Sequence, residues 1–121
     1  MAVILHSGVV KSFGQAQFQA TGEAFGFVTT RSGRDLFFHT VGYRRPMVDD
    51  RGEEVVFDSL SEPYPDLEET LQDLGRGTEI VFVLGWNRQG ECARTWCLRY
   101  EWQLAVYALR VYRERQREEG E

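Results

Sequence analysis

Two short aromatic segments joined by a turn-forming stretch place the strongest constraint on the fold of this chain. The segments are Phe25–Thr30 and Asp35–His39, and the four residues between them, 31–34, have the composition of a turn. Aromatic and β-branched residues favour strands, so the pattern predicts an antiparallel hairpin. In this pairing one face of the hairpin carries four neighbouring rings, those of Phe25, Phe27, Phe37 and His39.

Three more strands are expected along the chain. Residues 9–13 are rich in β-forming side chains and are bounded by glycines, 79–84 read as a buried strand, and 92–98 as a final strand. Residues 85–90, which contain Trp86 and Arg88, are expected to form the hairpin loop between the last two strands. The first strand is predicted to end at Phe13, and residues 14–24 are expected to form a long loop.

The middle of the chain, residues 46–75, differs in composition from the rest. It holds ten acidic residues and only one basic residue, a net charge of −9. Residues 48–57 predict a small hairpin that turns at Arg51-Gly52, and Asp66 is expected to cap a short helix with Leu67, Leu71 and Leu74 on one face. We consider three interpretations of this acidic segment. It is a solvated loop, it lies near the basic face where it imitates phosphate and tunes or blocks access, or it binds a basic protein partner.

Residues 100–119 contain neither Gly nor Pro and predict a helix. Val106, Tyr107, Val111 and Tyr112 also favour strands, so a longer β-extension is the competing interpretation. Apolar side chains occupy more than one face of the expected helix, whereas a lone surface helix needs one apolar stripe. We therefore expect the helix to pack both on its own domain and on a second copy, giving a homodimer.

The net charge of −5 at first argues against binding to phosphate-rich polymers. The acidic segment 46–75 supplies all of the excess, since residues 1–45 carry a net +3 and residues 76–121 a net +1. The remaining chain therefore carries a net charge of +4.

Several classes of protein are not expected from these residues. Cys92 and Cys97 are too few for a disulfide framework, and the histidines and cysteines lack metal-ligand spacing, so we predict no metal, no cofactor and no enzymatic activity. The N-terminus has no basic region before its apolar run, and no apolar stretch approaches the ~20 residues of a membrane span. The expected location is cytoplasmic, without membrane association.

The two aromatic segments resemble the paired motifs of cold-shock domains. Glu23–Val28 is similar to the family's Lys-Gly-Phe-Gly-Phe-Ile/Val, and Asp35–Thr40 to its Asp-Val-Phe-Val-His-Phe. Gly8–Phe13 resembles the family's opening strand, and similar matches in the same order extend to about residue 98. The resemblance implies an all-β fold: a five-stranded, antiparallel OB-type barrel over residues 1–99, with an acidic insert (46–75) between the third and fourth strands. Residues 100–121 would be a C-terminal helical extension.

The resemblance also implies a surface that binds single-stranded RNA or DNA. The four rings of the hairpin, Phe25, Phe27, Phe37 and His39, would stack on bases. Lys11 and Arg88 would touch backbone or bases, and Asp35 would take the family's acidic contact position. Stacking suits unpaired strands, because every base has a π-face that a duplex hides. Such proteins hold strands unpaired, as nucleic-acid chaperones or regulators of transcription or translation. The expected site comprises Lys11, Phe13, Phe25, Phe27, Asp35, Phe37, His39, Trp86 and Arg88.

The sequence departs from the family pattern at four positions. Ser12 and Thr40 replace aromatic residues, Glu23 replaces a lysine and Ala24 a glycine. Two stacking rings are therefore missing, and Trp86 and Tyr43 are the candidates to compensate. The alternative interpretations are that another segment covers the aromatic face, or that its rings are core. If the face is covered, the barrel serves protein–protein contact or oligomerisation and binds little nucleic acid.

Overall fold

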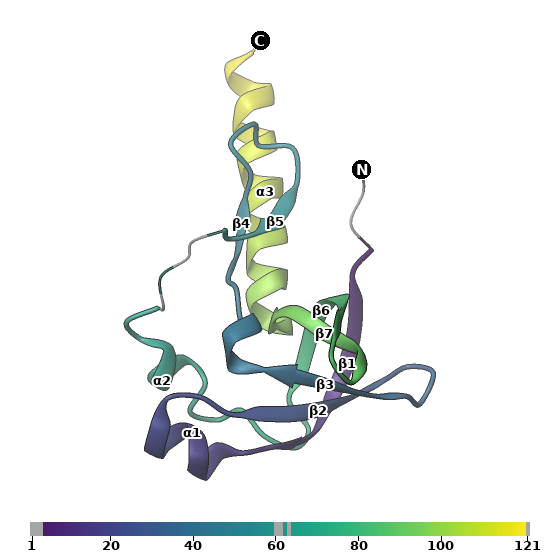
Figure 1. The fold of residues 1–121 in the computed structure, drawn as a ribbon. Coiled ribbons are helices and arrows are strands. Elements are labelled where there is room, and N and C mark those ends of the chain that lie inside the picture. Colours follow the sequence, from purple (N-terminus) through teal and green to yellow (C-terminus); the bar gives the residue numbers. More distant parts are fainter. Residues whose placement is uncertain (1–3, 60–61, 63, 121) are drawn as a thin grey trace.

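A computed structural model describes residues 4–59, 62 and 64–120 of the chain. Five strands form a closed barrel in the order β1-β2-β3-β7-β6, and a separate two-stranded sheet, β4-β5, stands beside the long C-terminal helix (Figure 1). The barrel strands are β1 (His6–Phe13), β2 (Phe25–Thr30), β3 (Asp35–His39), β6 (Glu79–Asn87) and β7 (Gly90–Leu98). The expected hairpin of β2 and β3 is confirmed, with the predicted bounds of both strands.

The barrel is mixed, so the prediction of a purely antiparallel barrel is wrong. Four of its neighbouring pairs are antiparallel, but β3 and β7 run parallel, with Phe37 opposite Cys92. The reason lies in the number of strands. Around a closed ring, directions can alternate throughout only when the number of strands is even, and a ring of five must contain one parallel pair.

The seam between β3 and β7 is supplemented by contacts beyond the ladder. Tyr43 forms an isolated parallel bridge with Trp96, and the backbone N–H of Arg44 donates to the Trp96 carbonyl at 2.9 Å. The indole Nε1 of Trp96 donates to the His39 carbonyl at 2.8 Å. The buried Trp96 side chain thus provides the hydrogen bond that a longer β3–β7 ladder would have given to the His39 carbonyl.

A β-bulge in β1 decides which side chains of this strand face inward. Val10 pairs with Val28, but the next pair is Ser12 with Phe27, so Lys11 is the extra residue. A bulge reverses the alternation that follows it. Phe13 therefore points into the barrel, where its ring lies 5.9 Å from that of Phe38, and Ser12 takes the outward position.

The core fills the barrel interior and extends under the first helix. Its largest fully buried side chains are Trp96, Tyr43, Phe18, Phe38 and Phe82. The predicted inward residues of the β2–β3 hairpin, Val28, Leu36 and Phe38, are all buried, as expected.

A helix that we did not predict, α1 (Gln15–Thr21), occupies the expected loop between β1 and β2. Gly22 ends it in the left-handed conformation (φ 82°), and its N–H donates to the Phe18 carbonyl at 2.7 Å. Phe18 is buried, and its ring lies 5.9 Å from that of Phe13. The side-chain amide of Gln15 donates to the carbonyls of Leu71 and Leu74, which ties α1 to the acidic segment.

The last two barrel strands form a tighter hairpin than expected. The strands continue through Asn87 and restart at Gly90, so only Arg88 and Gln89 lie in the turn. The predicted six-residue loop is wrong. Trp86 is therefore part of β6, opposite Glu91 of β7.

The acidic segment contributes a hairpin that lies along the C-terminal helix α3 (Arg99–Glu119) (Figure 1). Its strands are β4 (Pro46–Val48) and β5 (Val55–Phe57), and the predicted turn at Gly52 is confirmed (φ 67°). A Cβ on Gly52 would lie 2.1 Å from the ring of Tyr112, so glycine permits both the turn and its close approach to the helix. Phe57 packs on Trp102, with ring centroids 5.1 Å apart. The helix itself is confirmed, and the alternative β-extension is wrong.

The rest of the acidic segment carries α2 (Leu67–Thr70), which is shorter than expected. Leu71 and Leu74 are buried as predicted, although they lie beyond the end of the helix. Asp66 precedes the helix, but its side chain makes no capping hydrogen bond and instead accepts one from Arg45 at 2.7 Å. The predicted cap at Asp66 is therefore wrong.

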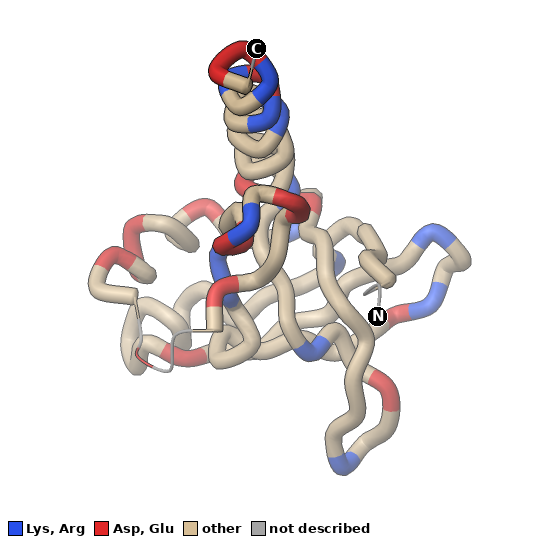
Figure 2. The backbone as a smooth tube through the Cα atoms, turned by 90° about the horizontal axis from the view of Figure 1, so that it is seen from above, with Lys and Arg blue, Asp and Glu red and all other residues tan. Residues whose placement is uncertain are grey.

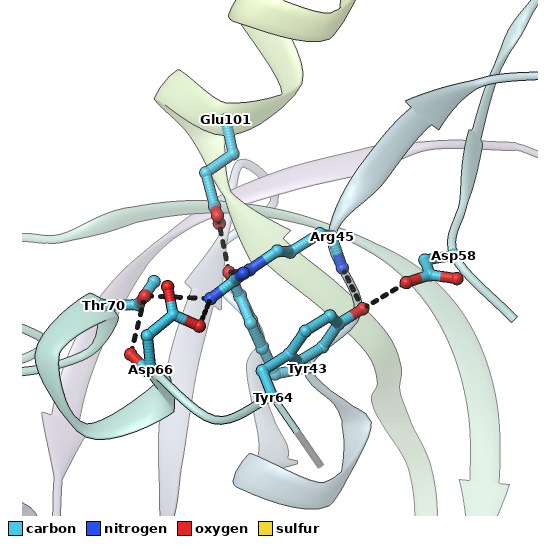
Figure 3. A network of polar contacts seen from close by, with 7 residues as sticks. All are labelled: Tyr43, Arg45, Asp58, Tyr64, Asp66, Thr70 and Glu101. Atoms are coloured by element: carbon cyan, nitrogen blue, oxygen red, sulfur yellow. Dashed lines mark hydrogen bonds and ion pairs between the residues drawn. The ribbon is translucent and has the colours of Figure 1, made fainter. Parts of the chain in front are cut away.

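A polar network anchors both α2 and α3 to the barrel (Figure 3). The hydroxyl of buried Tyr43 donates to Glu101 Oε2 at 2.5 Å and accepts from Arg45 Nε at 3.2 Å. Arg45 also donates to Asp66 and to Thr70, and the N–H of Leu98 donates to Glu101 Oε1 at 3.0 Å, at the start of α3. Burial and the bond to Glu101 raise the pKa of Tyr43 far above its usual range.

The loop before α2 is held by the same arginine. The guanidinium of Arg45 lies 4.3 Å from the ring centroid of Tyr64, and its backbone N–H donates to the Tyr64 hydroxyl at 3.0 Å. That hydroxyl donates to Asp58 Oδ2 at 3.0 Å. Arg45 thus contacts the loop between β5 and α2 at both ends, at Asp66 directly and at Asp58 through the Tyr64 hydroxyl.

None of the helices in the described part of the chain is both long enough and apolar enough to cross a membrane.

Candidate nucleic-acid interface

Four aromatic side chains form a continuous patch on the outer side of β2 and β3, as the sequence predicts. We call Phe25, Phe27, Phe37 and His39 the aromatic face. Phe25 lies opposite His39 and Phe27 opposite Phe37 in the ladder. The rings of Phe25 and Phe37 are stacked with centroids 5.4 Å apart, and Phe27 meets both edge-on at 6.2 Å.

The aromatic face is open to solvent. Phe25 is 48% exposed and Phe27 38%, whereas the interleaved Val28 and Phe38 are completely buried. The described acidic hairpin lies beside α3 instead of over β2 and β3 (Figure 1). Contiguous exposed apolar patches, unlike single exposed rings, are typical of interaction sites, so this face is a candidate for one.

Gly26 brings β1 close to the aromatic face. A Cβ at this position would lie 2.3 Å from the Ser12 carbonyl oxygen and 2.8 Å from the ring of Phe38. A side chain here would push β1 away from β2. The glycine of the first aromatic motif is therefore a packing requirement, and it holds Ser12 beside Phe27 on the outer side.

Two of the departures from the family pattern lie against each other. Thr40 is buried, its Oγ1 accepts from the Ala24 N–H at 3.1 Å, and its own N–H donates to the Ala24 carbonyl at 3.0 Å. Thr40 therefore closes the end of the hairpin and is unavailable for stacking. His39 is oriented by the N–H of Val41, which donates to its Nδ1 at 3.0 Å.

A lysine and an aspartate border the aromatic face. Lys11 Nζ donates to Asp35 Oδ2 at 2.7 Å, and Thr29 Oγ1 donates to Asp35 Oδ1 at 2.8 Å. The hydrogen bond from Lys11, followed by that from Thr29, lowers the pKa of Asp35. The side chain of Lys11 stays 61% exposed and can reach solvent ligands while paired.

An open hollow of about 460 Å³ continues from the aromatic face towards the β6–β7 hairpin. Its lining includes the rings of Phe37, His39 and Trp86 together with Arg44 and Arg94. Trp86 is 70% exposed and so presents a further ring for stacking. The hollow therefore joins the aromatic face to an isolated tryptophan through a stretch with two cationic side chains.

Neither arginine of the hollow belongs to the site predicted from the sequence. Arg44 follows the second motif and donates to the carbonyls of Tyr43 and Val41, and Arg94 lies on β7 with its stem against Gly85. A partial signal existed for Arg94, because it occupies an outward position between the buried Ala93 and Trp96 in an expected strand. The position of Arg44 depends on the turn after β3, which has no sequence signature.

Not every residue of the predicted site lies on this surface. Phe13 points into the core and Tyr43 is buried, which removes both from the stacking set. Arg88 is exposed at the β6–β7 turn, beyond the residues that line the hollow. Arg34 forms an ion pair with Glu91, linking the β2–β3 turn to that hairpin.

The described residues contain no group of three or more His, Cys, Asp or Glu side chains placed to hold a metal ion. Cys92 and Cys97 are buried free thiols, and burial raises the pKa of both. The chemistry that the surface offers is stacking on rings and contact with cations.

No protein-family model matches the chain, and no curated protein is significantly similar to it in sequence.

Proposed function

We propose that this protein binds single-stranded RNA or DNA by stacking bases on the aromatic face. The observation that carries the proposal is the set of four adjoining rings on the outer side of the barrel, of which Phe25 and Phe27 are exposed and Phe37 and His39 are half-buried. Aromatic rings on the outer side of a small barrel are a typical platform for unpaired bases, with little sequence preference. Bases of a duplex hide their faces and would not bind in this way.

We further propose that the barrel is of the OB type and belongs to the cold-shock family. The closed five-stranded ring and the two aromatic motifs on its neighbouring second and third strands support this assignment. OB-type barrels bind oligonucleotides through these strands. In this assignment the acidic segment 46–75 is an insert between the third and fourth barrel strands.

The proposed path of the strand runs from Phe25 and Phe27 across Phe37 and His39 to Trp86. Arg44 and Arg94 line the same hollow as the last two rings, so a backbone that connects bases stacked on those rings would pass near both cations. Because few cations lie along this path, stacking should supply most of the affinity. The affinity should depend only weakly on salt, since log K falls with log salt concentration by roughly 0.7 per phosphate contact in a single strand.

Titration of labelled oligonucleotides followed by fluorescence anisotropy tests the proposal. We expect binding of pyrimidine-rich and mixed single strands at low salt, and much weaker binding of the matching duplex. Replacement of Phe25 or Phe37 by Ala should weaken binding by about 1–3 kcal/mol, or roughly fivefold to a hundredfold. Met47→Ala is the matched control, because Met47 is 43% exposed on β4, away from the aromatic face.

Two results would overturn the proposal. One is the absence of binding to either single strand at low salt, which would leave protein–protein contact as the role of the barrel. The other is unchanged binding by Phe25→Ala and Phe37→Ala proteins whose circular dichroism shows that they are folded.

A further inference from the structure

The C-terminal helix carries an apolar stripe that nothing in the described structure covers. Tyr100, Leu104 and Tyr107 are 56%, 62% and 64% exposed, and Val111 continues the series. Their spacing of four, three and four residues aligns them along one side of α3. We call these four residues the α3 stripe.

The acidic hairpin lies on the opposite side of the same helix. Phe57 packs on Trp102, Gly52 lies against Tyr112, and Arg113 donates to the Glu53 carbonyl. At 3.6 residues per turn, positions 102, 112 and 113 face away from the α3 stripe. The helix is therefore partnered on one side only, although it is apolar on two.

We propose that the α3 stripe binds the same stripe of a second copy of this chain, with the two helices antiparallel. In the register that centres the stripe, Leu104 of each copy lies opposite Tyr107 of the other, and Tyr100 opposite Val111. Each apolar side chain is then buried against an apolar side chain, which provides the driving force for association.

The charges beyond the stripe select the antiparallel arrangement. Glu114 and Glu118 extend the line of the stripe towards the C-terminus, where acidic and basic residues alternate (Figure 2). In a parallel pair these glutamates would face their own copies and repel. In the antiparallel pair Glu114 instead lies opposite position 97 of the other copy, next to the start of its α3 and the positive end of the helix dipole.

A groove at the start of α3 complements the basic flank of the helix. This groove has a volume of about 380 Å³, and its lining includes Tyr100 and Gln103 of the helix, Asp73, and Glu79 in an ion pair with Arg99. Arg110 and Arg117 follow Gln103 at intervals of seven residues and share its flank. Equivalent flanks meet in an antiparallel pair, so Arg117 of one copy approaches the groove of the other, where Asp73 offers a carboxylate.

Sedimentation velocity and light scattering over a range of concentrations test the proposal. We expect the full chain to reach twice its monomer mass as concentration rises. The double variant Leu104→Glu/Tyr107→Glu should raise the dimer dissociation constant by at least about tenfold. Val106→Glu is the matched control, since Val106 is 36% exposed on α3 but lies outside the stripe.

Cysteine cross-linking tests the direction of the helices. Tyr100→Cys and Val111→Cys proteins, when mixed and oxidised, should form a disulfide-linked dimer that neither forms alone. The natural cysteines are buried and should not interfere. The charge argument is tested by Arg117→Glu, which should weaken the dimer more than Arg115→Glu on the other flank.

Three outcomes would overturn the proposal. A monomer mass for the unmodified chain up to about 1 mM excludes a useful dimer. A dimer that survives Leu104→Glu/Tyr107→Glu excludes the α3 stripe. Cross-linking of Tyr100→Cys protein with itself, without linkage to Val111→Cys, excludes the antiparallel pair. Nucleic-acid binding by the monomeric double variant shows that failure of the dimer leaves the proposed function standing.

Discussion

Lys11 Nζ lies 2.7 Å from Asp35 Oδ2, so the only lysine of the chain is held by an acidic residue at the border of the aromatic face. The bulge in β1 makes this contact possible, because Lys11 is the residue that the ladder with β2 skips. The pair leaves little net positive charge beside the stacking rings. It provides a direct test of how far charge contributes to binding.

Replacement of Asp35 by Asn should strengthen the binding of single strands. The substitution removes a negative charge and releases Lys11 towards phosphate, so log K should fall more steeply with log salt, by roughly 0.7. Anisotropy titrations at several salt concentrations measure both effects. Asp50→Asn changes net charge equally on the distant acidic hairpin and should alter binding little. Weaker binding by Asp35→Asn would show instead that Asp35 contacts the bases itself.

A tryptophan at position 12 should add a stacking platform. Ser12 is exposed and lies opposite Phe27 in the ladder, so a large ring there would extend the aromatic face across β1. We expect Ser12→Trp to gain about 1–3 kcal/mol in the binding of a strand long enough to reach it. The same measurement on Met47→Trp, far from the face, controls for a general effect of an exposed indole. Equal affinities for the two variants would place the strand away from β1.

Loss of the Tyr43 hydroxyl should destabilise the protein without unfolding it. Tyr43→Phe removes the hydrogen bond to Glu101, which holds the start of α3, and leaves the ring in place. Bonds to charged groups of this kind contribute about 1.5–3 kcal/mol, and we expect a loss near the lower end in urea denaturation. Tyr100→Phe, at an exposed tyrosine of the same helix, should have no effect. A Tyr43→Phe protein as stable as the unmodified chain would contradict the anchoring role of this network.

The contact between Arg45 and Asp66 should make stability depend on pH in the acid range. The hydrogen bond from Arg45 lowers the pKa of Asp66 below its ordinary value of 3.8, so the folded state favours the carboxylate. The contribution of this contact to the free energy of unfolding is fully present above the ordinary pKa of 3.8. It is lost as the pH falls through the lowered pKa of Asp66 in the folded state.

We therefore expect the difference in free energy of unfolding between the unmodified chain and Asp66→Asn to be largest near neutral pH. It should shrink as the pH falls below about 4. Denaturation curves at a series of pH values measure it, and Glu68→Gln serves as the control at an exposed carboxylate of α2. A difference that does not change with pH would mean that Arg45 does not hold the charged form of Asp66.

The central hairpin was predictable because its signals are local. Phe25–Thr30 and Asp35–His39 alternate with the period of a strand, and the turn between them has turn chemistry, so bounds, register and outward face all follow. The parallel closure of the barrel was also accessible, from the odd number of strands. The helix α1 had a weaker signal, since Gln and Ala between two glycines suit a short helix.

Features that depend on tertiary contact could not be derived in this way. The bulge at Lys11 depends on how β1 pairs with both β2 and β6, and it turns Phe13 inward against simple alternation. Asp66 has a capping residue's identity but binds Arg45, a partner 21 positions away. The placement of the acidic hairpin beside α3 depends on contacts such as Gly52 with Tyr112, which no sequence period reports.

The odd strand number also has a mechanical consequence. It requires a parallel strand pair, and this pair, β3 with β7 at Phe37 and Cys92, lies within the proposed binding surface. The aromatic face lies on β2 and β3, and Trp86 lies on β6, beyond β7. A nucleic-acid strand that stacks on both the aromatic face and Trp86 would bridge the β3–β7 pair, where the barrel has its shortest ladder. Binding would then restrict opening of the β3–β7 pair. Amide hydrogen exchange along β3 and β7 should therefore slow on binding more than hydrogen exchange at the well-paired tip of the β6–β7 hairpin.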